Sequence, residues 1–395
     1  MDILDASRFA AKLVRREISC RLVRPTNALF FITYRCSSRC TTCTMWRRGR
    51  SEDELGLDRW KSAVDQCAQA GVRNIEMFGG DALLRPEVLF SLIEHASAQG
   101  VACDVVTNGL LLDVEAARQL VLSGTSLVAI SIDGVGETHD SVRGVPGAFE
   151  RALAGLRHLK AARESHSSTP GVPRIAINCT VSRRNVKELE PLVELAEREG
   201  PDVLAFEYVG QVSETAIRAS AVNGVFPDPY FVVQEESNYL SEEEAGSLKR
   251  WIDEKHAASK PTGVVLNTEN IDVLDPRQMS AGRLPWKKCY VCRSLVIVDP
   301  SGNVLCCPFF SRYYLGNISV EPLSHIWNGD RHRLFVRSQE GKKMAICGEC
   351  ILTLQRNPTF AESLVKRFYQ YRRRRRHGDR HAERNDERYF SQGPC

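Results

Sequence analysis

The cysteines constrain this chain more than any other feature of its sequence. The 395 residues include 14 cysteines, and nine of these fall into two groups far apart in the chain. The members of the first group are Cys36, Cys40 and Cys43, and those of the second are Cys289, Cys292, Cys306, Cys307, Cys347 and Cys350. Cysteines in a reducing compartment bind metal or do redox chemistry more often than they form disulfides. The sequence therefore predicts two separate thiolate sites.

Composition and charge limit the class of protein. A hydrophobic content of 43% over 395 residues is typical of a globular protein with about two domains. No apolar run approaches the roughly 20 residues of a membrane-spanning helix, and the first residues lack the pattern of a secretory signal. These features predict a cytoplasmic protein. The arginine run Arg372–Arg376 alone exceeds the net charge of +4, so nucleic acid is not an expected partner of the remaining chain.

Apolar strand-like runs alternate with segments of helical periodicity. The expected strands cover residues 28–33, 74–78, 101–107, 127–132, 175–181 and 203–208, and the expected helices cover 58–70, 86–99, 114–122, 148–163 and 186–198. Such βα repeats predict a parallel sheet with right-handed crossovers. We therefore expect an α/β fold, a partial (β/α)6 TIM-like barrel, with the functional residues after the carboxyl ends of the strands.

The other segments suggest how the chain is divided. We expect an N-terminal amphipathic helix in residues 1–25, the barrel in 26–240, a connecting helix and loop in 241–288, a small cysteine-rich domain in 289–355 and a basic extension in 356–395. Ser241 and Glu244 form a capping box that would start the connecting helix. Residues 209–238 lack periodicity and read as a loop on the substrate side. The basic extension is expected to be a disordered, solubilising end, with contact to an anionic surface as the alternative.

The first cysteine group directly follows the first expected strand. Three thiolates on one short loop can hold three irons of a four-iron cluster and leave the fourth iron open. Zinc is the alternative because it also binds thiolates. A structural zinc site usually closes with a fourth Cys or His nearby, and none follows this loop at a suitable distance. The spacing therefore favours an iron–sulfur cluster.

The CxxxCxxC spacing after a first strand resembles that of the radical S-adenosylmethionine (radical SAM) superfamily. Three further segments, each placed after a later strand, extend the resemblance: Gly79-Gly80-Asp81-Ala82, similar to the family's GGEP motif, Thr107-Asn108-Gly109, and Ser131-Ile132-Asp133-Gly134. The resemblance implies a 4Fe–4S cluster on Cys36, Cys40 and Cys43 that binds S-adenosylmethionine. Reductive cleavage of this cofactor yields a 5′-deoxyadenosyl radical in the family.

The resemblance also implies cofactor-binding residues. They are Gly79, Gly80, Asp81, Asn108, Ser131 and Arg143. Arg143 is the expected partner of the cofactor carboxylate, and the glycines are expected where the backbone approaches the ligand. The chain departs from the family pattern at Thr42, where an aromatic residue is common, and Trp46 is a candidate to supply that surface. Asp81 and Ala82 replace the usual Glu and Pro.

The second cysteine group resembles the SPASM module or its shorter twitch form. The arrangement is Cys292-x9-Gly302-x4-Cys307 followed by Cys347-x2-Cys350. The resemblance implies one auxiliary 4Fe–4S cluster on these four cysteines, and either Cys289 or Cys306 could replace a neighbour. A zinc ribbon is the alternative, because CxxC pairs are common zinc ligands.

Together the two sites predict an oxidoreductase. We expect hydrogen abstraction from a small polar metabolite such as a sugar, an aminocyclitol or a natural-product intermediate, with the auxiliary cluster as electron acceptor. A small metabolite is preferred because only about 27 residues precede the first strand, too few for a domain that binds a peptide leader. The alternatives are a maturase of a ribosomally synthesised peptide, a redox-neutral epimerase and a non-enzymatic metal protein.

Two further expectations concern the reaction. Glu207 and Tyr208, at the end of the sixth strand, are the candidate catalytic proton acceptors. A flavodoxin or a ferredoxin is the expected electron donor.

Overall fold

The computed structural model describes residues 24–49, 51, 53–167, 172–231, 237–258, 263–284 and 289–352. The predicted N-terminal amphipathic helix and the basic extension with Arg372–Arg376 lie outside the described residues. None of the described helices is both long and apolar enough to cross a membrane.

One sheet of ten strands organises the described chain, in the order β10-β9-β8-β1-β2-β3-β4-β5-β6-β7. The strands are β1 (Asn27–Thr33), β2 (Asn74–Gly79), β3 (Ala102–Thr107), β4 (Leu127–Ser131), β5 (Arg174–Val181), β6 (Val203–Tyr208), β7 (Val265–Asn267), β8 (Leu295–Val298), β9 (Asn303–Leu305) and β10 (Tyr314–Asn317). Strands β1 to β8 all pair in parallel, whereas β9 pairs antiparallel with both of its neighbours, β8 and β10. Each of the six predicted strands is present, with each end within one residue of the prediction, and together they form the predicted partial barrel.

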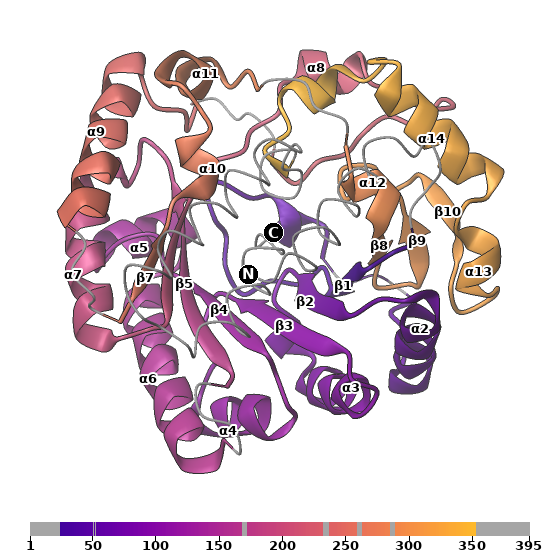
Figure 1. The fold of residues 1–395 in the computed structure, drawn as a ribbon, viewed down its shortest axis with the longest axis horizontal. Helices are drawn as coiled ribbons and strands as arrows, with labels where there is room; N and C mark the ends of the chain where they lie inside the picture. Colours follow the sequence, from indigo (N-terminus) through magenta and orange to yellow (C-terminus); the bar gives the residue numbers. More distant parts are fainter. Residues whose placement is uncertain are drawn as a thin grey trace, which may run out of the picture.

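Helices cover the outside of this sheet (Figure 1). The α-helices are α2 (Leu57–Ala70), α3 (Pro86–Ala98), α4 (Val114–Leu122), α5 (Glu137–Arg143), α6 (Ala148–His166), α7 (Leu189–Glu199), α8 (Glu214–Arg218), α9 (Glu242–Ala258), α10 (Glu269–Asp272), α11 (Pro276–Ala281), α12 (Val291–Ser294), α13 (Leu323–Ile326) and α14 (Asp330–Glu340). Short 3-10 helices occur at Met45–Arg47, Ala82–Leu84, Val186–Glu188 and Ala345–Gly348. Trp60 of α2 is fully buried and packs on Phe30 of β1 with 5.1 Å between ring centroids. The apolar stripe of each helix thus closes the core against the strands.

The segment between the barrel and the rear cysteines is more regular than predicted. A connecting helix and a loop were expected in residues 241–288, but the part after α9 contains β7, α10 and α11. Strand β7 extends the parallel sheet beside β6, with Val265 opposite Val203. A three-residue strand is too short to show period-two alternation, so its partner strand, not its own pattern, determines it. The predicted capping box does form, because Ser241 N donates to Glu244 Oε2 at 2.8 Å and Glu244 N donates to Ser241 Oγ at 3.2 Å.

The rear segment joins the same sheet. Strand β8 lies parallel to β1, from Asn27 opposite Leu295 to Phe30 opposite Val298. Gln66 of α2 adds a second connection, since its amide donates to Ile318 O at 3.0 Å and accepts from Leu323 N at 2.8 Å. The barrel and the rear segment therefore form one packed structure.

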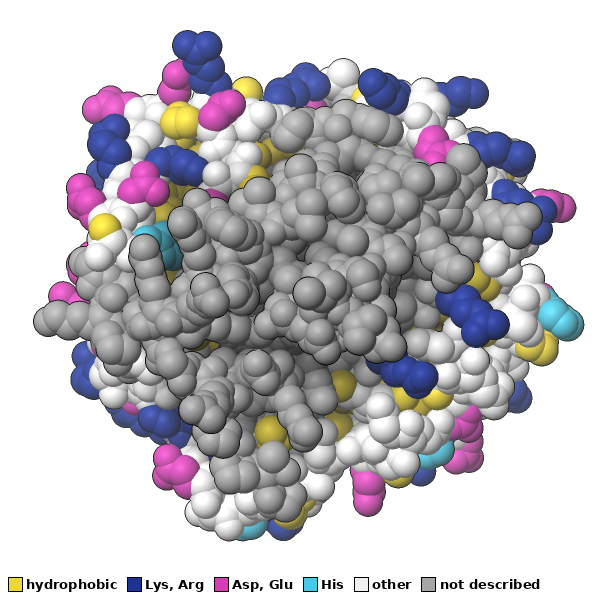
Figure 2. Space-filling view, in the orientation of Figure 1, with side chains coloured by type: hydrophobic (Ala, Val, Ile, Leu, Met, Phe, Trp, Pro, Cys, Tyr) yellow, Lys and Arg dark blue, Asp and Glu magenta, His cyan; other side chains and the backbone are white. Residues whose placement is uncertain are grey.

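Among the described residues on the face shown in Figure 2, positive and negative side chains are interspersed.

Candidate functional site

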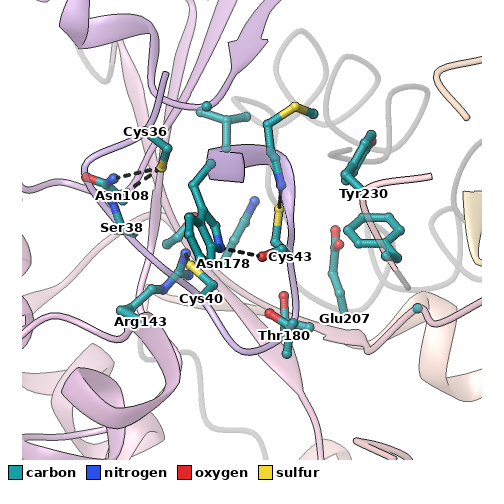
Figure 3. A pocket seen from close by; sticks show the side chains of 18 of the residues that line it. Cys36, Ser38, Cys40, Cys43, Asn108, Arg143, Asn178, Thr180, Glu207 and Tyr230 are labelled. Atoms are coloured by element: carbon teal, nitrogen blue, oxygen red, sulfur yellow. Dashed lines mark hydrogen bonds between the residues drawn. The ribbon is translucent and has the colours of Figure 1, made fainter. Parts of the chain in front are cut away.

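A pocket lies at the carboxyl ends of the barrel strands (Figure 3). Most of the residues predicted to bind the front cluster and the cofactor line it. The predicted residues in its wall are Cys36, Cys40, Cys43, Gly79, Gly80, Asn108, Ser131, Arg143, Glu207 and Tyr208. These residues come from the ends of different strands, so the parallel sheet brings them to one place. Asp81 is not in the wall and is buried directly behind it, with 1% of its surface exposed.

Hydrogen-bond donors point at the three thiol sulfurs of the front loop. Ser38 N donates to Cys36 Sγ at 3.4 Å, Met45 N donates to Cys43 Sγ at 3.4 Å, and Arg143 Nη1 donates to Cys40 Sγ at 3.7 Å. Donors of this kind stabilise a thiolate that binds a metal. The front loop is therefore prepared for three negatively charged sulfur ligands.

Burial makes these thiols weak acids as long as no metal is bound. Burial, with a smaller contribution from the neighbouring Cys40, raises the pKa of Cys36 to about 11 and that of Cys43 to about 12. Metal binding to such thiols would release protons. Within the described ranges, no three His, Cys, Asp or Glu side chains meet the spacing for a single metal ion. Three thiols from one short loop line this pocket, the number that an iron–sulfur cluster with one open iron takes from the protein.

Gly79 and Gly80 lie where two backbone segments approach each other closely. A Cβ at Gly80 would lie 1.9 Å from Arg35 O, and a Cβ at Gly79 would lie 2.1 Å from Thr33 O. Gly79 also has a φ of +136°, which disfavours other residues. The glycines therefore let the cysteine loop pass directly over the end of β2, so the immediate cause is close approach of two backbones.

Asp81 supports the pocket from behind. Thr107 Oγ1 donates to both carboxylate oxygens of Asp81 at 3.1 Å, and Leu83 N donates to Oδ1 at 3.1 Å. Burial raises the pKa of Asp81 to about 6, although these hydrogen bonds oppose the shift. The carboxylate thus ties the ends of β2 and β3 together.

A buried ion pair orients Arg143. Its Nε lies 2.8 Å from Asp133 Oδ2, while its Nη1 reaches Cys40 Sγ. Asp133 is 1% exposed and also accepts from Thr180 N at 2.8 Å. Asp133 belongs to the Ser131–Gly134 motif, but the sequence analysis assigned it no role. Its contact with Arg143 depends on the position of α5 relative to the end of β4, which the sequence does not show.

Two polar atoms in the wall have no hydrogen-bond partner within the described part of the chain. They are Ser38 Oγ and Asn178 Oδ1. Buried polar atoms are nearly always satisfied, so these two atoms indicate a polar ligand in the pocket. Asn178 was missed by the sequence analysis, although its inward-facing position on β5 would have pointed to it.

The two proton-acceptor candidates lie in different surroundings. Glu207 lines the pocket near Thr180 and Tyr230 (Figure 3). The hydroxyl of Tyr208 donates to Met279 O at 2.9 Å and accepts from Leu240 N at 3.0 Å. Both hydrogen bonds hold the Tyr208 hydroxyl in the protein core. Successive strand residues face opposite sides, which explains the difference. Of the pair, Glu207 is the one placed for chemistry.

Aromatic side chains form the remaining wall. Trp46, Phe78, Tyr230 and Phe231 line the pocket, and Trp46 Nε1 donates to Cys43 O at 3.0 Å. Trp46 and Thr42 both line the pocket, and Trp46 remains the candidate for the aromatic surface that Thr42 does not supply. Tyr230 and Phe231 belong to the loop that was expected on the substrate side.

The rear cysteines separate into two kinds. Cys292 and Cys306 are 2% and 1% exposed, and their sulfurs point at backbone carbonyls: Cys292 Sγ donates to Cys289 O at 3.3 Å, and Cys306 Sγ donates to Cys292 O at 3.6 Å. Burial raises the pKa of Cys307 well above its usual value, and the neighbouring Cys350, Cys289 and Cys347 raise it further.

The four residues of the predicted ligand set, Cys292, Cys307, Cys347 and Cys350, have Cys289 as a further neighbour. Cys289 is the neighbour that raises the pKa of Cys347, after burial itself. Cys289 thus lies near Cys307, Cys347 and Cys350, and Cys292 lies near Cys289 and Cys307, since these neighbours shift one another's pKa. The Cys292 thiol also donates to a backbone carbonyl.

One short segment, residues 228–231, connects the two cysteine regions. Thr44 N, next to Cys43, donates to Tyr230 O at 2.8 Å, and Asp228 N donates to Phe309 O at 2.7 Å. Ile351, which follows Cys350, also lines the front pocket. A molecule in this pocket would therefore touch residues adjacent to both groups of thiols.

Two family models match the chain over the regions just described. The model of the radical SAM superfamily matches residues 30–179, and the SPASM model, described as an iron–sulfur cluster-binding domain, matches residues 289–351. The first covers the front loop and strands β1 to β5, and the second covers all six rear cysteines.

Curated relatives match either about four fifths of this chain or less than half of it. Mycofactocin maturase MftC of Mycobacterium tuberculosis is 26% identical over 324 residues, which cover 81% of this chain and 74% of the relative. AdoMet-dependent heme synthase of Nitratidesulfovibrio vulgaris is 27% identical over 327 residues, 81% of this chain and 83% of the relative. AdoMet-dependent heme synthase of Methanosarcina barkeri is 35% identical over 185 residues, but this match spans only 45% of this chain and 50% of the relative.

Solved structures share the fold. Streptococcus suis SuiB bound to S-adenosylmethionine superposes with a TM-score of 0.60 at 14% identity, over 92% of this chain and 78% of that chain. The peptide complex of anSMEcpe with bound AdoMet superposes with a TM-score of 0.58 at 17% identity, over 82% of this chain and 88% of that chain. At these identities, the superpositions support the architecture alone.

Proposed function

The chain belongs to the radical SAM superfamily and has a C-terminal SPASM iron–sulfur domain, and we propose that it oxidatively modifies a peptide. The observation that carries the proposal is the pocket, whose wall contains Cys36, Cys40 and Cys43 as well as Ile351, the neighbour of Cys350. A substrate bound there would lie between the two cysteine sites. When bound, a 4Fe–4S cluster with S-adenosylmethionine supplies the hydrogen-abstracting radical, and an auxiliary 4Fe–4S cluster supplies an electron acceptor.

The front residues would divide the work of holding the cofactor. Cys36, Cys40 and Cys43 would bind the cluster, and Arg143, oriented by Asp133, would pair with the carboxylate of S-adenosylmethionine. The other predicted cofactor residues are Gly79, Gly80, Asp81, Asn108 and Ser131. We infer that Asp81 acts indirectly, by holding the backbone of the pocket, because it is buried behind the wall.

The rear ligands in this proposal are Cys289, Cys307, Cys347 and Cys350. This set replaces Cys292 of the predicted set with Cys289, since the Cys292 thiol already donates to a backbone carbonyl. Four protein thiolates would complete one auxiliary cluster. Further clusters are not part of the proposal. The enzyme needs a reductant, and a flavodoxin or ferredoxin remains the proposed donor.

Glu207 is the proposed proton acceptor. A two-electron oxidation removes a hydrogen atom, a proton and an electron from the substrate, and Glu207 is the carboxylate in the pocket wall that can take the proton. The aromatic wall of Trp46, Phe78, Tyr230 and Phe231 excludes water and suits an apolar or aromatic side chain of the substrate.

The comparisons favour a peptide over the sugar or aminocyclitol that the sequence analysis preferred. MftC, named as a maturase, aligns with 81% of the chain. A porphyrin is the second candidate substrate, because AdoMet-dependent heme synthases align with a similar share and reach 35% identity over 185 residues. A planar porphyrin would also suit an aromatic wall.

The test compares substrates on the reconstituted, reduced enzyme with S-adenosylmethionine. Short peptides encoded beside this gene, Fe-coproporphyrin III and 2-deoxy-scyllo-inosamine would each be added, and 5′-deoxyadenosine and substrate mass would be followed. We expect a peptide to raise deoxyadenosine formation about tenfold or more and to lose mass. A response to the porphyrin or the aminocyclitol alone would refute peptide modification. Failure of the reduced enzyme to form deoxyadenosine with any substrate would refute the radical mechanism as well.

A further inference from the structure

We propose that Glu349 is a positioning residue of the auxiliary site. It lies between Cys347 and Cys350, and these two cysteines belong both to the predicted and to the proposed ligand set. Its carboxylate holds the rear turn, residues 345–351, on Ser213 at the start of α8. Glu349 is not a cluster ligand in this proposal, and it acts by fixing the two thiols beside it. The inference rests on the auxiliary cluster of the proposed function.

The carboxylate of Glu349 accepts two hydrogen bonds from one residue of the barrel. Ser213 N donates to Glu349 Oε2 at 2.7 Å, and Ser213 Oγ donates to Glu349 Oε1 at 3.1 Å. Glu349 is 7% exposed, and hydrogen bonds to a charged group are stronger than those between neutral groups. Arg283 Nη1 lies 3.7 Å from Oε1, but the arginine side chain is 74% exposed, so this ion pair contributes little. Ser213 is therefore the partner that fixes the carboxylate.

Two further contacts join the rear turn to the same part of the barrel. Ile346 N donates to the hydroxyl of the fully buried Ser220 at 2.9 Å. A Cβ at Gly210 would lie 2.7 Å from Ile351 Cγ2, so Ile351 packs directly on the backbone there. Figure 1 shows α8 next to the yellow end of the described chain, which contains the rear turn. Residues 210–220 thus hold the rear turn at its start, at its middle and at its end.

Residues of the pocket lie on the same segment of the barrel. Glu207, the proposed proton acceptor, is on β6, and Gly210 follows this strand. Both residues line the pocket, as does Ile351 of the rear turn. The contact between Glu349 and Ser213 therefore fixes the electron-accepting side of the proposed reaction relative to its proton-accepting side.

The chemistry of the contact predicts a graded response to substitution. A carboxylate presents two acceptor oxygens, and Ser213 presents two donors, its backbone N–H and its hydroxyl. Glu349→Gln keeps one acceptor oxygen, and Glu349→Ala keeps none. Ser213→Thr keeps both donors, whereas Ser213→Ala keeps only the backbone N–H. Removal of a group that holds metal ligands in place commonly weakens metal binding about tenfold or more.

The experiment isolates the rear site. The full chain with Cys36→Ala, Cys40→Ala and Cys43→Ala would be reconstituted anaerobically, so that about four irons per chain remain. Glu349→Ala, Glu349→Gln, Ser213→Ala and Ser213→Thr would be added singly to this parent, and Glu349→Ala also together with Ser213→Ala. Release of iron to a chelator gives the stability of the rear cluster, and circular dichroism reports on the fold.

Two control variants remove related contacts. Ser213 also caps α8, and Asp113 caps α4 in the same way, so Asp113→Ala shows the effect of losing a helix cap in another helix. Arg283→Gln removes the ion pair of Glu349 and leaves both hydrogen bonds from Ser213 in place. Both controls should release iron at the rate of the parent.

We expect Glu349→Ala to release iron about tenfold faster than the parent, with Glu349→Gln and Ser213→Ala between the two. Ser213→Thr should match the parent, because it keeps the hydroxyl. The double variant should release iron no faster than Glu349→Ala alone, since both changes act on one contact. Complete loss of rear iron from Glu349→Ala, with an intact fold by circular dichroism, would also support the positioning role.

Three outcomes would contradict the proposal. Iron-release rates of Glu349→Ala and Ser213→Ala equal to those of the controls would overturn this inference alone. Independent effects, which multiply in the double variant, would show that the two residues do not act through one contact and would overturn it as well. If the parent itself binds no four-iron cluster, the auxiliary cluster of the proposed function falls, and this inference with it.

Discussion

Arg143 and Asp133 form an ion pair that is buried beside the front cysteines, with 2.8 Å between Arg143 Nε and Asp133 Oδ2. The side chains are 13% and 2% exposed. The ion pair leaves Nη1 of Arg143 able to donate to Cys40 Sγ. The carboxylate of Asp133 therefore fixes the position of the Arg143 guanidinium in the pocket.

This pair predicts a defect in cofactor binding for Asp133→Asn. The variant removes the partner of a buried guanidinium, and Arg143 should then lose its fixed orientation toward the cofactor carboxylate. We expect the dissociation constant for S-adenosylmethionine to rise about tenfold or more, with the iron content of the front site retained. Isothermal titration of the reconstituted protein measures the constant. The control is Glu137→Gln, because Glu137 is an exposed acid on α5, the helix that also carries Arg143. Equal affinities of the two variants would show that Asp133 does not position Arg143.

Gly80→Ala should disrupt the front cysteine loop. The new Cβ would lie 1.9 Å from Arg35 O, and this backbone atom cannot move without displacing the loop that carries Cys36. We expect loss of the front iron, about four irons per chain, and of deoxyadenosine formation, while the rear iron is retained. Gly56→Ala is the matched control, because no atom lies within 4 Å of its added Cβ. Iron analysis of both variants tests the prediction, and full iron content in Gly80→Ala would contradict it.

The rear cysteines can be compared one at a time. In the chain that lacks the front cysteines, Cys289→Ala should lose the remaining iron, whereas Cys292→Ala should keep about four irons per chain. The reason is that the Cys292 thiol donates to a backbone carbonyl, while Cys289 neighbours both Cys307 and Cys347. Iron and sulfide analysis decides the matter. The reverse pattern would restore Cys292 as a ligand.

His139 predicts a pH dependence of stability. It is fully buried, and its Nδ1 accepts from Asp133 N at 3.0 Å, so the ring is neutral. Burial, and then the charge of Arg143, lower its pKa from 6.5 to about 4. A histidine whose folded pKa is depressed costs stability as pH falls below its unfolded pKa, because the unfolded chain takes up the proton first. At pH 5.5 the loss should be about 1.4 kcal/mol relative to high pH.

The measurement is a difference between two proteins. Thermal unfolding of the native chain and of His139→Asn would be followed between pH 8 and pH 5.5, since asparagine can still accept a hydrogen bond but does not titrate. The melting temperature of the native chain should fall relative to that of the variant over this interval. Parallel melting curves would indicate that His139 is protonated, or is exposed, in the folded protein.

The sequence was sufficient for the strands of the barrel and for the residues that follow them. Long buried runs such as Asn27–Thr33 carry their own signal, and a parallel sheet collects whatever follows such runs at one edge. Strand β7 lacked such a signal, because three residues show no period and only pairing with β6 defines the strand. The same reason applies to the helices after it.

The sequence did not show which of two neighbouring candidate residues has the predicted role. Glu207 and Tyr208 were predicted together and both line the pocket, but the hydroxyl of Tyr208 is bonded to Met279 O. Cys289 and Cys292 both have cysteine-motif spacing, and the fold brings both of them near other rear thiols, so their spacing alone does not choose the ligand. Gly80 was correctly singled out as a place of close approach, but the approaching group is the backbone of Arg35, which no local pattern reveals.

The ladder between β1 and β8 has a consequence for electron flow. Neighbouring strands in a sheet stand about 4.8 Å apart, and their hydrogen bonds allow little sliding or hinging. The rear cysteines therefore cannot swing toward or away from the front loop as a hinged domain would. Any electron that passes between the two sites crosses a gap of constant width, so the distance dependence of its rate is set when the protein folds. Substrate and cofactor can change the driving force across that gap, but the length of the path is built into the sheet.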